Sequence, residues 1–245
     1  MNLRGGVKLI LRVENICKHF GGLKVMDHMS LEVKKGEIVG IMGPNGAGKT
    51  TLINIISGFE KADTGEIYLN NERITNMEPH IIAQKGIRRS FQTASNFPEE
   101  TIAENVRAAL ICGNYMNKQQ EQQKVEEILD EVKMLGLAKK KVCEVPSVCS
   151  KLIELCRCLI ANPLLVLLDE LYAGLTWEES KMVTKLLKEK REKQGISFIL
   201  IEHRTEILFD AVDRIVVMSQ GSKFFEGLPS EVVANESVAK LYWGR

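Results

Sequence analysis

The chain has 245 residues, of which 44% are hydrophobic and 27% are charged. That length buries a sizeable core, either in one globular domain with a large insertion or in two domains that share a core. Its 33 lysines and arginines offset 32 aspartates and glutamates, so no broad positive field exists for nucleic acid, and its apolar runs fall far short of the ~18 residues that span a bilayer.

The N-terminal part of the sequence predicts β-strands. Residues 8–16 alternate between apolar and polar side chains, and residues 37–42 form a further apolar run after the turn residues 34–36. A glycine-rich loop follows at once. Beyond the loop, Lys49–Ile56 has the composition of a helix, and Gly58 is its expected stop.

The middle of the sequence changes from strand to helix. The segment GEIYLNNERIT predicts a hairpin with Asn70 and Asn71 at its turn. From about residue 93 to residue 161 the pattern is helical, beneath an outer face of glutamine, glutamate and lysine that is taken as solvated surface rather than a binding tract. The apolar residues at helical spacing are Val125, Ile128, Leu129, Val132 and Leu135.

The C-terminal part predicts a strand, a helix and a second strand. Residues 164–168 form an apolar run typical of a buried parallel strand. Thr176 and Glu179 have the spacing of a capping box, which opens a helix that Gly195 ends before the strand at residues 196–202. Short links between such elements predict a parallel sheet.

A phosphate-binding motif lies between the strand at residues 37–42 and the following helix. The run GPNGAGKT matches the pattern G-x-x-x-x-G-K-[ST], and this strand and helix context argues against a mere glycine-rich turn. Backbone N–H groups would surround phosphate oxygens, Lys49 would supply a cation, and the Thr50 hydroxyl would bind Mg²⁺. The predicted nucleotide-binding residues of the loop are Gly43, Pro44, Asn45, Gly46, Ala47, Gly48, Lys49, Thr50 and Thr51.

Two carboxylates follow the apolar run at residues 164–168. Asp169 and Glu170 come where a buried strand emerges at its carboxyl end, the edge at which open α/β sheets bind ligands. We expect Asp169 to hold Mg²⁺ and Glu170 to polarise an attacking water. The alternative is an ordinary polar strand terminus, which the nearby phosphate loop disfavours.

His203 and Gln92 are two further candidates. His203 ends the strand at residues 196–202 and would hydrogen-bond a γ-phosphate beside Asp169 and Glu170, although a lone histidine is more often structural. Gln92 lies where the β-rich part gives way to the helical part, so it is a candidate for sensing metal or water at a hinge. Taken alone, Gln92 would more often be a surface residue.

With these motifs, the chain resembles the ATP-binding-cassette (ABC) ATPase subunits over essentially its whole length. GPNGAGKTT corresponds to the Walker A loop, FQ to the Q-loop, LLVLLDE to Walker B and IEH to the H-loop. Phe20 matches the aromatic A-loop position that stacks on adenine. Within the family, FGGLKVMD, RRSFQTASNFPEETIAENV, IEHR and VAKLYWGR resemble the ATPases of branched-chain amino acid importers.

One family motif is nearly erased. Members carry an L-S-G-G-Q signature that reaches across a dimer to the ATP on the other subunit, and counting back from CRCLIANP places it on residues 145–149, VPSVC. Pro146 has neither hydroxyl nor N–H, Val148 adds bulk, and Cys149 replaces an amide. The next loop also departs, with Leu171 for proline and Thr176 for an acid or amide. Both elements act across the dimer.

The resemblance implies a single α/β ABC domain over residues 1–245. A RecA-like P-loop NTPase core with an antiparallel β flank is expected at residues 1–92 and 161–245, and an inserted α-helical subdomain at residues 93–160. The expected cofactors are ATP and Mg²⁺. The expected catalytic residues are Glu170, His203 and Gln92, and the expected metal ligands are Thr50, Gln92 and Asp169.

The function implied is ATP hydrolysis at a dimer interface to drive import of a small solute, most readily branched-chain amino acids. The expected partners are permease subunits and a second cassette, with a heterodimer favoured over a homodimer. The chain would lie peripherally on the cytoplasmic face of the inner membrane, without nucleic acid. The alternatives are a cassette with little hydrolysis of its own, as half of an asymmetric pair, and a soluble ABC protein of translation or DNA repair.

Overall fold

A six-stranded sheet forms the centre of the molecule in the computed structural model, which describes residues 8–91, 96–110 and 117–243. Its strand order is β10-β9-β3-β8-β7-β6, and all neighbours are parallel except β10 and β9. The strands are β3 (Ile38–Met42), β6 (Ile87–Arg89), β7 (Leu165–Asp169), β8 (Ser197–Ile201), β9 (Arg214–Ser219) and β10 (Ser222–Gly227).

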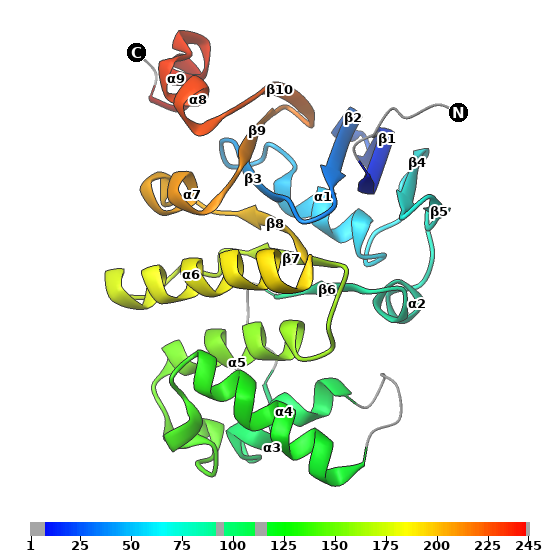
Figure 1. The fold of residues 1–245 in the computed structure, drawn as a ribbon. Coiled ribbons are helices and arrows are strands. Elements are labelled where there is room, and N and C mark those ends of the chain that lie inside the picture. Colours follow the sequence, from blue (N-terminus) through cyan, green and yellow to red (C-terminus); the bar gives the residue numbers. More distant parts are fainter. Residues whose placement is uncertain (1–7, 92–95, 111–116, 244–245) are drawn as a thin grey trace, which may run out of the picture.

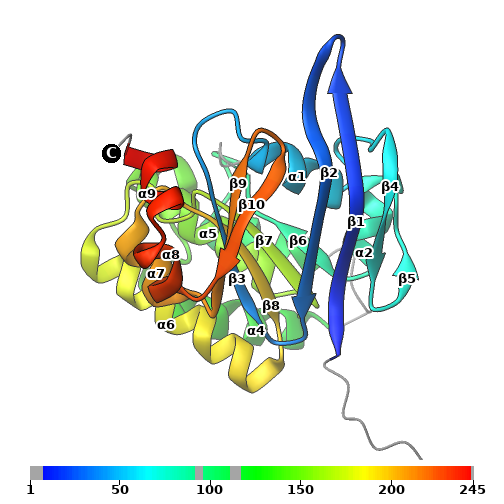
Figure 2. The same cartoon turned by 90° about the horizontal axis from the view of Figure 1, so that it is seen from above.

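A second, antiparallel sheet flanks the first, as expected (Figure 1). Its order is β2-β1-β4-β5, and β1 and β2 form the long hairpin that extends from the molecule in Figure 2. Asn70 and Asn71 have φ angles of 47° and 68°, so the predicted turn joins β4 to β5. The strands are β1 (Leu9–Phe20), β2 (Leu23–Lys34), β4 (Thr64–Leu69) and β5 (Glu72–Arg73).

Helices cover one face of the six-stranded sheet, and the helix at Lys49–Ile56 covers the other together with the antiparallel sheet. Every residue of β3, β7 and β8 is buried, which explains why these strands are continuous apolar runs. Alternate residues of each strand join two separate hydrophobic clusters, one on each face. The α-helices are α1 (Lys49–Ile56), α2 (Pro79–Gln84), α3 (Ile102–Arg107), α4 (Lys118–Glu131), α5 (Ser147–Leu159), α6 (Trp177–Gln194), α7 (Thr205–Ala211), α8 (Pro229–Ala234) and α9 (Glu236–Trp243).

Helices α3, α4 and α5 form a block on one side of the sheet (Figure 1). Short 3₁₀ helices connect them, and the prediction that Leu135 continues the apolar stripe of α4 is wrong. The helix ends at Glu131 in a Schellman motif, because Lys133 takes a left-handed φ of 58° and Met134 N–H bonds to the Leu129 carbonyl at 2.7 Å. Leu135 is 40% exposed. The 3₁₀ helices are Ala108–Leu110, Leu135–Leu137 and Val142–Glu144.

Helix α6 connects β7 to β8 in the predicted strand–helix–strand unit. Thr176 is its N-cap and forms the predicted capping box with Glu179, while Gly195 ends the helix with a left-handed φ of 69°. In the part of the chain that the structure describes, no helix combines the length and the apolar character needed to cross a membrane.

Candidate functional site

The carboxyl ends of three parallel strands meet at one edge of the six-stranded sheet and border a cleft. Strands β3, β8 and β7 are neighbours, so the residues that follow each strand lie close together. The cleft has a volume of about 340 Å³. It is lined by Leu23, Val25, Asn45, Gly46, Ala47, Gly48, Lys49, Thr50, Thr51, Glu170, Ile201 and His203. The structure thus brings the predicted loop to the predicted ends of β7 and β8.

Glycines determine the course of the loop between β3 and α1. Gly43 passes so close to β9 that a Cβ atom there would lie 2.3 Å from the carbonyl oxygen of Met218. Gly48 precedes α1 with a φ of +96°, a conformation that L side chains rarely adopt. The loop therefore presents the N-terminus of α1 to the cleft, where the N–H groups of the first helical turn favour an anion.

Lys49 places a cation at the floor of this loop. Its Nζ donates hydrogen bonds to the carbonyl oxygens of Gly43, at 2.7 Å, and Pro44, at 3.0 Å. Burial lowers the pKa of the ammonium group, and the charges of Asp169 and Glu170 act in the opposite direction. These two hydrogen bonds fix the Lys49 ammonium group beside the loop, where it can bind phosphate oxygens.

Asp169 ends β7 with a carboxylate that is only 1% exposed. Neither carboxylate oxygen has a hydrogen-bond partner among the described residues, and the Arg89 guanidinium lies 3.9 Å from Oδ2. Burial raises the pKa of Asp169, while Arg89 lowers it. Buried carboxylate oxygens without donors fit a hard cation, and Thr50, which lines the cleft together with Glu170, the residue after Asp169, supplies a further oxygen. These residues therefore fit Mg²⁺.

Glu170 and His203 meet across the edge of the sheet. His203 Nε2 lies 3.2 Å from Glu170 Oε1, which is the juxtaposition expected from the strand order. Glu170 has a left-handed φ of 53°, rare for a residue with a side chain. Three hydrogen bonds hold this backbone: Glu170 N–H donates to the Ile201 carbonyl at 2.9 Å, and the Glu170 carbonyl accepts from Lys151 Nζ at 3.2 Å and from the Ala173 N–H at 3.3 Å. Such strain is characteristic of functional positions.

Arg89 is a residue of this site that no sequence motif identified. It ends β6, and besides approaching Asp169 its Nη1 donates to Asn54 Oδ1 on α1 at 2.6 Å. Its guanidinium lies 5.6 Å from the Phe59 ring centroid and 5.1 Å from that of Phe91. The sequence RRSFQ shows two adjacent arginines but not which one points inward, so only the structure could assign this contact.

Four of the predicted residues that the structure describes are not part of the cleft lining: Phe20, Gly43, Pro44 and Asp169. Phe20 ends β1 with a ring that is 44% exposed, and the lining comes instead from Leu23 and Val25 of β2. Lys18 Nζ lies 5.0 Å from the Phe20 ring centroid. Gln92 lies outside the described residues. Adenine stacking by Phe20 and metal sensing by Gln92 therefore stay predictions.

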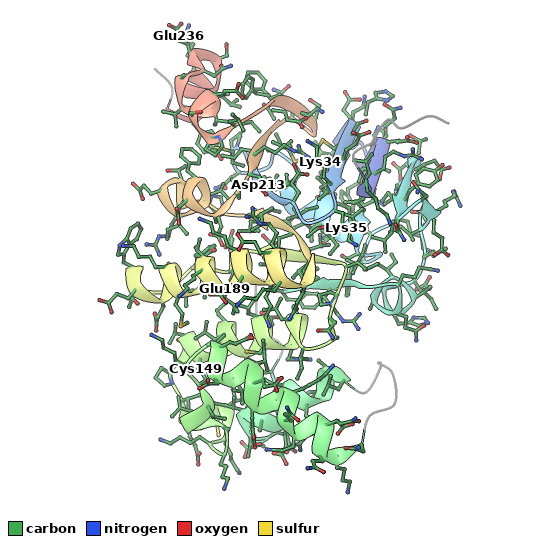
Figure 3. The ribbon with its side chains drawn as sticks, viewed as in Figure 1. Lys34, Lys35, Cys149, Glu189, Asp213 and Glu236 are labelled. Atoms are coloured by element: carbon green, nitrogen blue, oxygen red, sulfur yellow. The ribbon has the colours of Figure 1, made fainter. Side chains whose placement is uncertain are left out.

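The segment at residues 145–149 begins α5, and Cys149 is labelled there in Figure 3. Pro146 occupies the N-cap without a side-chain hydrogen bond, and Ser147 is the first residue of the helix. Both are exposed, whereas Val145 and Val148 pack against the core. Cys149 is buried, and its burial raises the pKa of the thiol. The Ser147 hydroxyl therefore lies one position past the N-cap. At the N-cap itself, a hydroxyl would accept hydrogen bonds from the free N–H groups of the first helical turn.

Glu202, which follows β8 beside this site, is expected to make the free energy of unfolding depend on pH. The side chain is 3% exposed and accepts the Tyr172 N–H at 2.9 Å, and burial raises the pKa of its carboxyl from 4.5 to about 7. Because the folded-state pKa is the higher one, its stabilisation is complete below about pH 4.5 and is lost as pH rises through 7.

We therefore expect Glu202→Gln, which keeps the acceptor oxygen but cannot ionise, to flatten the pH dependence of stability. At pH 8 the variant should unfold with a free energy up to about 3 kcal/mol higher than the parent, and at pH 4.5 the two should agree. Urea unfolding at both pH values measures this. Parallel pH profiles for the two proteins would show that folding does not raise the pKa of Glu202.

The comparisons with known proteins agree with this geometry. The family model described as ABC transporter matches residues 26–173. A probable branched-chain amino acid transport ATP-binding protein LivG of Methanocaldococcus jannaschii is 37% identical, over 96% of this chain and 97% of that protein. A high-affinity branched-chain amino acid transport ATP-binding protein, BraF of Pseudomonas aeruginosa, is 31% identical, over 96% of this chain and 98% of that protein.

Solved structures show the same fold. A crystal structure of the ADP conformation of an ATP-binding cassette of an ABC transporter superimposes with a TM-score of 0.85 and 36% sequence identity, covering 97% of this chain and 99% of that one. A nucleotide-free cassette from an ABC transporter gives a TM-score of 0.85 at 35% identity, covering 96% of this chain and 98% of that one.

Proposed function

This chain belongs to the ABC transporter family, and from that premise we propose that it is the ATPase subunit of a membrane importer for branched-chain amino acids. The observation that carries the proposal is the convergence of Lys49, Glu170 and His203 on one cleft beside a phosphate-binding loop. The solute is suggested by the relatives, which are branched-chain amino acid transport ATP-binding proteins. Hydrolysis coupled to transport is better supported than the alternative of a cassette that only binds ATP.

ATP would lie along the loop with its phosphates at the N-terminus of α1. Lys49 would neutralise the phosphate oxygens, and the Thr50 hydroxyl and Asp169 carboxylate would hold Mg²⁺, which supplies electrostatic stabilisation of the phosphates. Glu170 would accept a proton from the attacking water, and His203 would orient Glu170 and contact the γ-phosphate. Phe20 would stack on adenine, and Gln92 would contact the metal.

Lys49→Ala tests the assignment of the loop. MgATP should bind the parent with a free energy of roughly −8 to −4 kcal/mol, and the variant should lose most of that binding because an ammonium held over the phosphates is gone. Isothermal titration calorimetry measures both. Lys61→Ala, an exposed lysine paired weakly with Glu78, is the matched control and should bind as the parent does. Unchanged affinity in Lys49→Ala would refute the assignment.

The subunit would work on the cytoplasmic face of the inner membrane, held there by permease subunits. ABC cassettes act in pairs, and we propose a heterodimer here, since VPSVC at residues 145–149 cannot supply the usual donors across a dimer. The domain division proposed is an ATP-binding core at residues 1–92 and 161–245 and a helical subdomain at residues 93–160. The helices α3, α4 and α5 within the latter range support it.

A further inference from the structure

The C-terminal helix α9 reaches back to the phosphate-binding loop. It begins at Glu236, labelled in Figure 3, and is anchored by Val238, which is fully buried. Tyr242, on the last turn of this helix, packs against the core with its ring. Its hydroxyl oxygen accepts a hydrogen bond from the backbone N–H of Gly43 at 2.5 Å, across 199 residues of sequence.

Gly43 is the residue from which the loop leaves β3. Its carbonyl oxygen accepts the hydrogen bond from Lys49 Nζ at 2.7 Å, so the residue is held at its N–H by Tyr242 and at its carbonyl by Lys49. The next peptide, between Gly43 and Pro44, has no N–H because its nitrogen belongs to proline. Of the first two residues of the loop, Gly43 and Pro44, only Gly43 has a backbone N–H, and the Tyr242 hydroxyl accepts its hydrogen bond.

We propose that Tyr242 is a positioning residue for nucleotide binding: its hydroxyl fixes the Gly43 peptide and thereby the place from which Lys49 reaches the phosphates. This inference rests on the proposed role of the loop in ATP binding. Partial burial of Tyr242 strengthens this hydrogen bond, because little water is near to compete for the hydroxyl. The same burial raises the pKa of the phenol. The hydroxyl therefore stays protonated and neutral at physiological pH.

The chain contains a matched control at the other end of β3. The hydroxyl oxygen of Ser197, a fully buried residue, accepts the N–H of Gly36 at 2.9 Å. Gly36 precedes β3 as Gly43 follows it, so both bonds join a side-chain hydroxyl to a glycine N–H beside the same strand. Only the bond of Tyr242 lies at the phosphate edge of the sheet.

The test compares Tyr242→Phe with Ser197→Ala in the full chain. Tyr242→Phe loses the bond from Gly43, whereas Ser197→Ala loses the bond from Gly36 and the one that Ser197 donates to the Lys34 carbonyl at 3.3 Å. Each variant should lose only a small part of its stability, because a neutral hydrogen bond contributes modestly. Tyr242→Phe should raise the dissociation constant for MgATP by about 3- to 10-fold, as expected for one such bond. Ser197→Ala should leave it unchanged. Hydrogen exchange of the Gly43 amide, measured by NMR, should accelerate in Tyr242→Phe alone.

Lys49→Ala, measured alongside, separates the failure of this inference from that of the proposed function. If Lys49→Ala weakens ATP binding while Tyr242→Phe binds as the parent does, the ATP site stands and the positioning role is wrong. If Tyr242→Phe and Ser197→Ala weaken binding equally, the effect is general destabilisation, which also overturns the inference. If Lys49→Ala itself has no effect, the proposed function fails.

Discussion

Replacing Glu170 with glutamine should leave MgATP bound and lower its hydrolysis by about 10²- to 10⁴-fold, the usual contribution of a positioned general base. The carboxylate lies 3.2 Å from His203 Nε2 and lines the cleft beside Lys49. An amide of the same size keeps the packing but cannot take a proton from water. Affinity and turnover should therefore separate in this variant.

Single-turnover hydrolysis with the enzyme in excess measures this effect, because it isolates the chemical step from nucleotide exchange. The assay requires the cassette paired with its partner. Glu189→Gln is the control, since Glu189 lies on α6 among lysines and outside the cleft. Hydrolysis by Glu170→Gln at the parental rate would assign the base to another group, whereas lost ATP binding would mean that Glu170 has a structural role.

Much of the site could be predicted because it depends on strand ends. The runs at residues 37–42, 164–168 and 196–202 are largely apolar, so they predict parallel strands buried on both faces, and the residues that follow such strands share one edge. The strand ends alone therefore predict that Lys49, Glu170 and His203 lie close together. The capping box at Thr176 and the stop at Gly195 were equally local signals, and both are confirmed.

The features that escaped prediction depend on contacts between distant residues or on unusual residues in familiar turns. The approach of Arg89 to Asp169 and that of Tyr242 to Gly43 join parts of the chain whose relative orientation no local pattern gives. Lys133 ends α4 in a left-handed conformation usually taken by glycine, so the sequence carried no stop signal. Glu170 is strained in the same way, held by its bonds to neighbouring elements.

A homodimer of this chain should hydrolyse ATP about 10²- to 10⁴-fold more slowly than a heterodimer with a cassette that has an intact signature. Each missing preorganised donor at a developing charge costs about 10²–10³ in rate, and several are missing between residues 145 and 149. Pro146 occupies the N-cap of α5, Val148 packs against the core and Cys149 is buried. In a homodimer both nucleotides would face this segment.

In the heterodimer, one site of the two should be active: the site built from Lys49, Glu170 and His203 of this chain and the partner's signature. Glu170→Gln in this chain should therefore abolish steady-state turnover, while the corresponding change in the partner should have little effect, because the partner's nucleotide faces VPSVC. Co-expressing the two cassettes and changing one glutamate at a time measures the asymmetry. Rapid hydrolysis by the pure homodimer, in which Lys49, Glu170 and His203 face VPSVC, would show that Ser147 and its neighbours act as a working signature. The reverse asymmetry would show the same, because the hydrolysed nucleotide would then be the partner's, which also faces VPSVC.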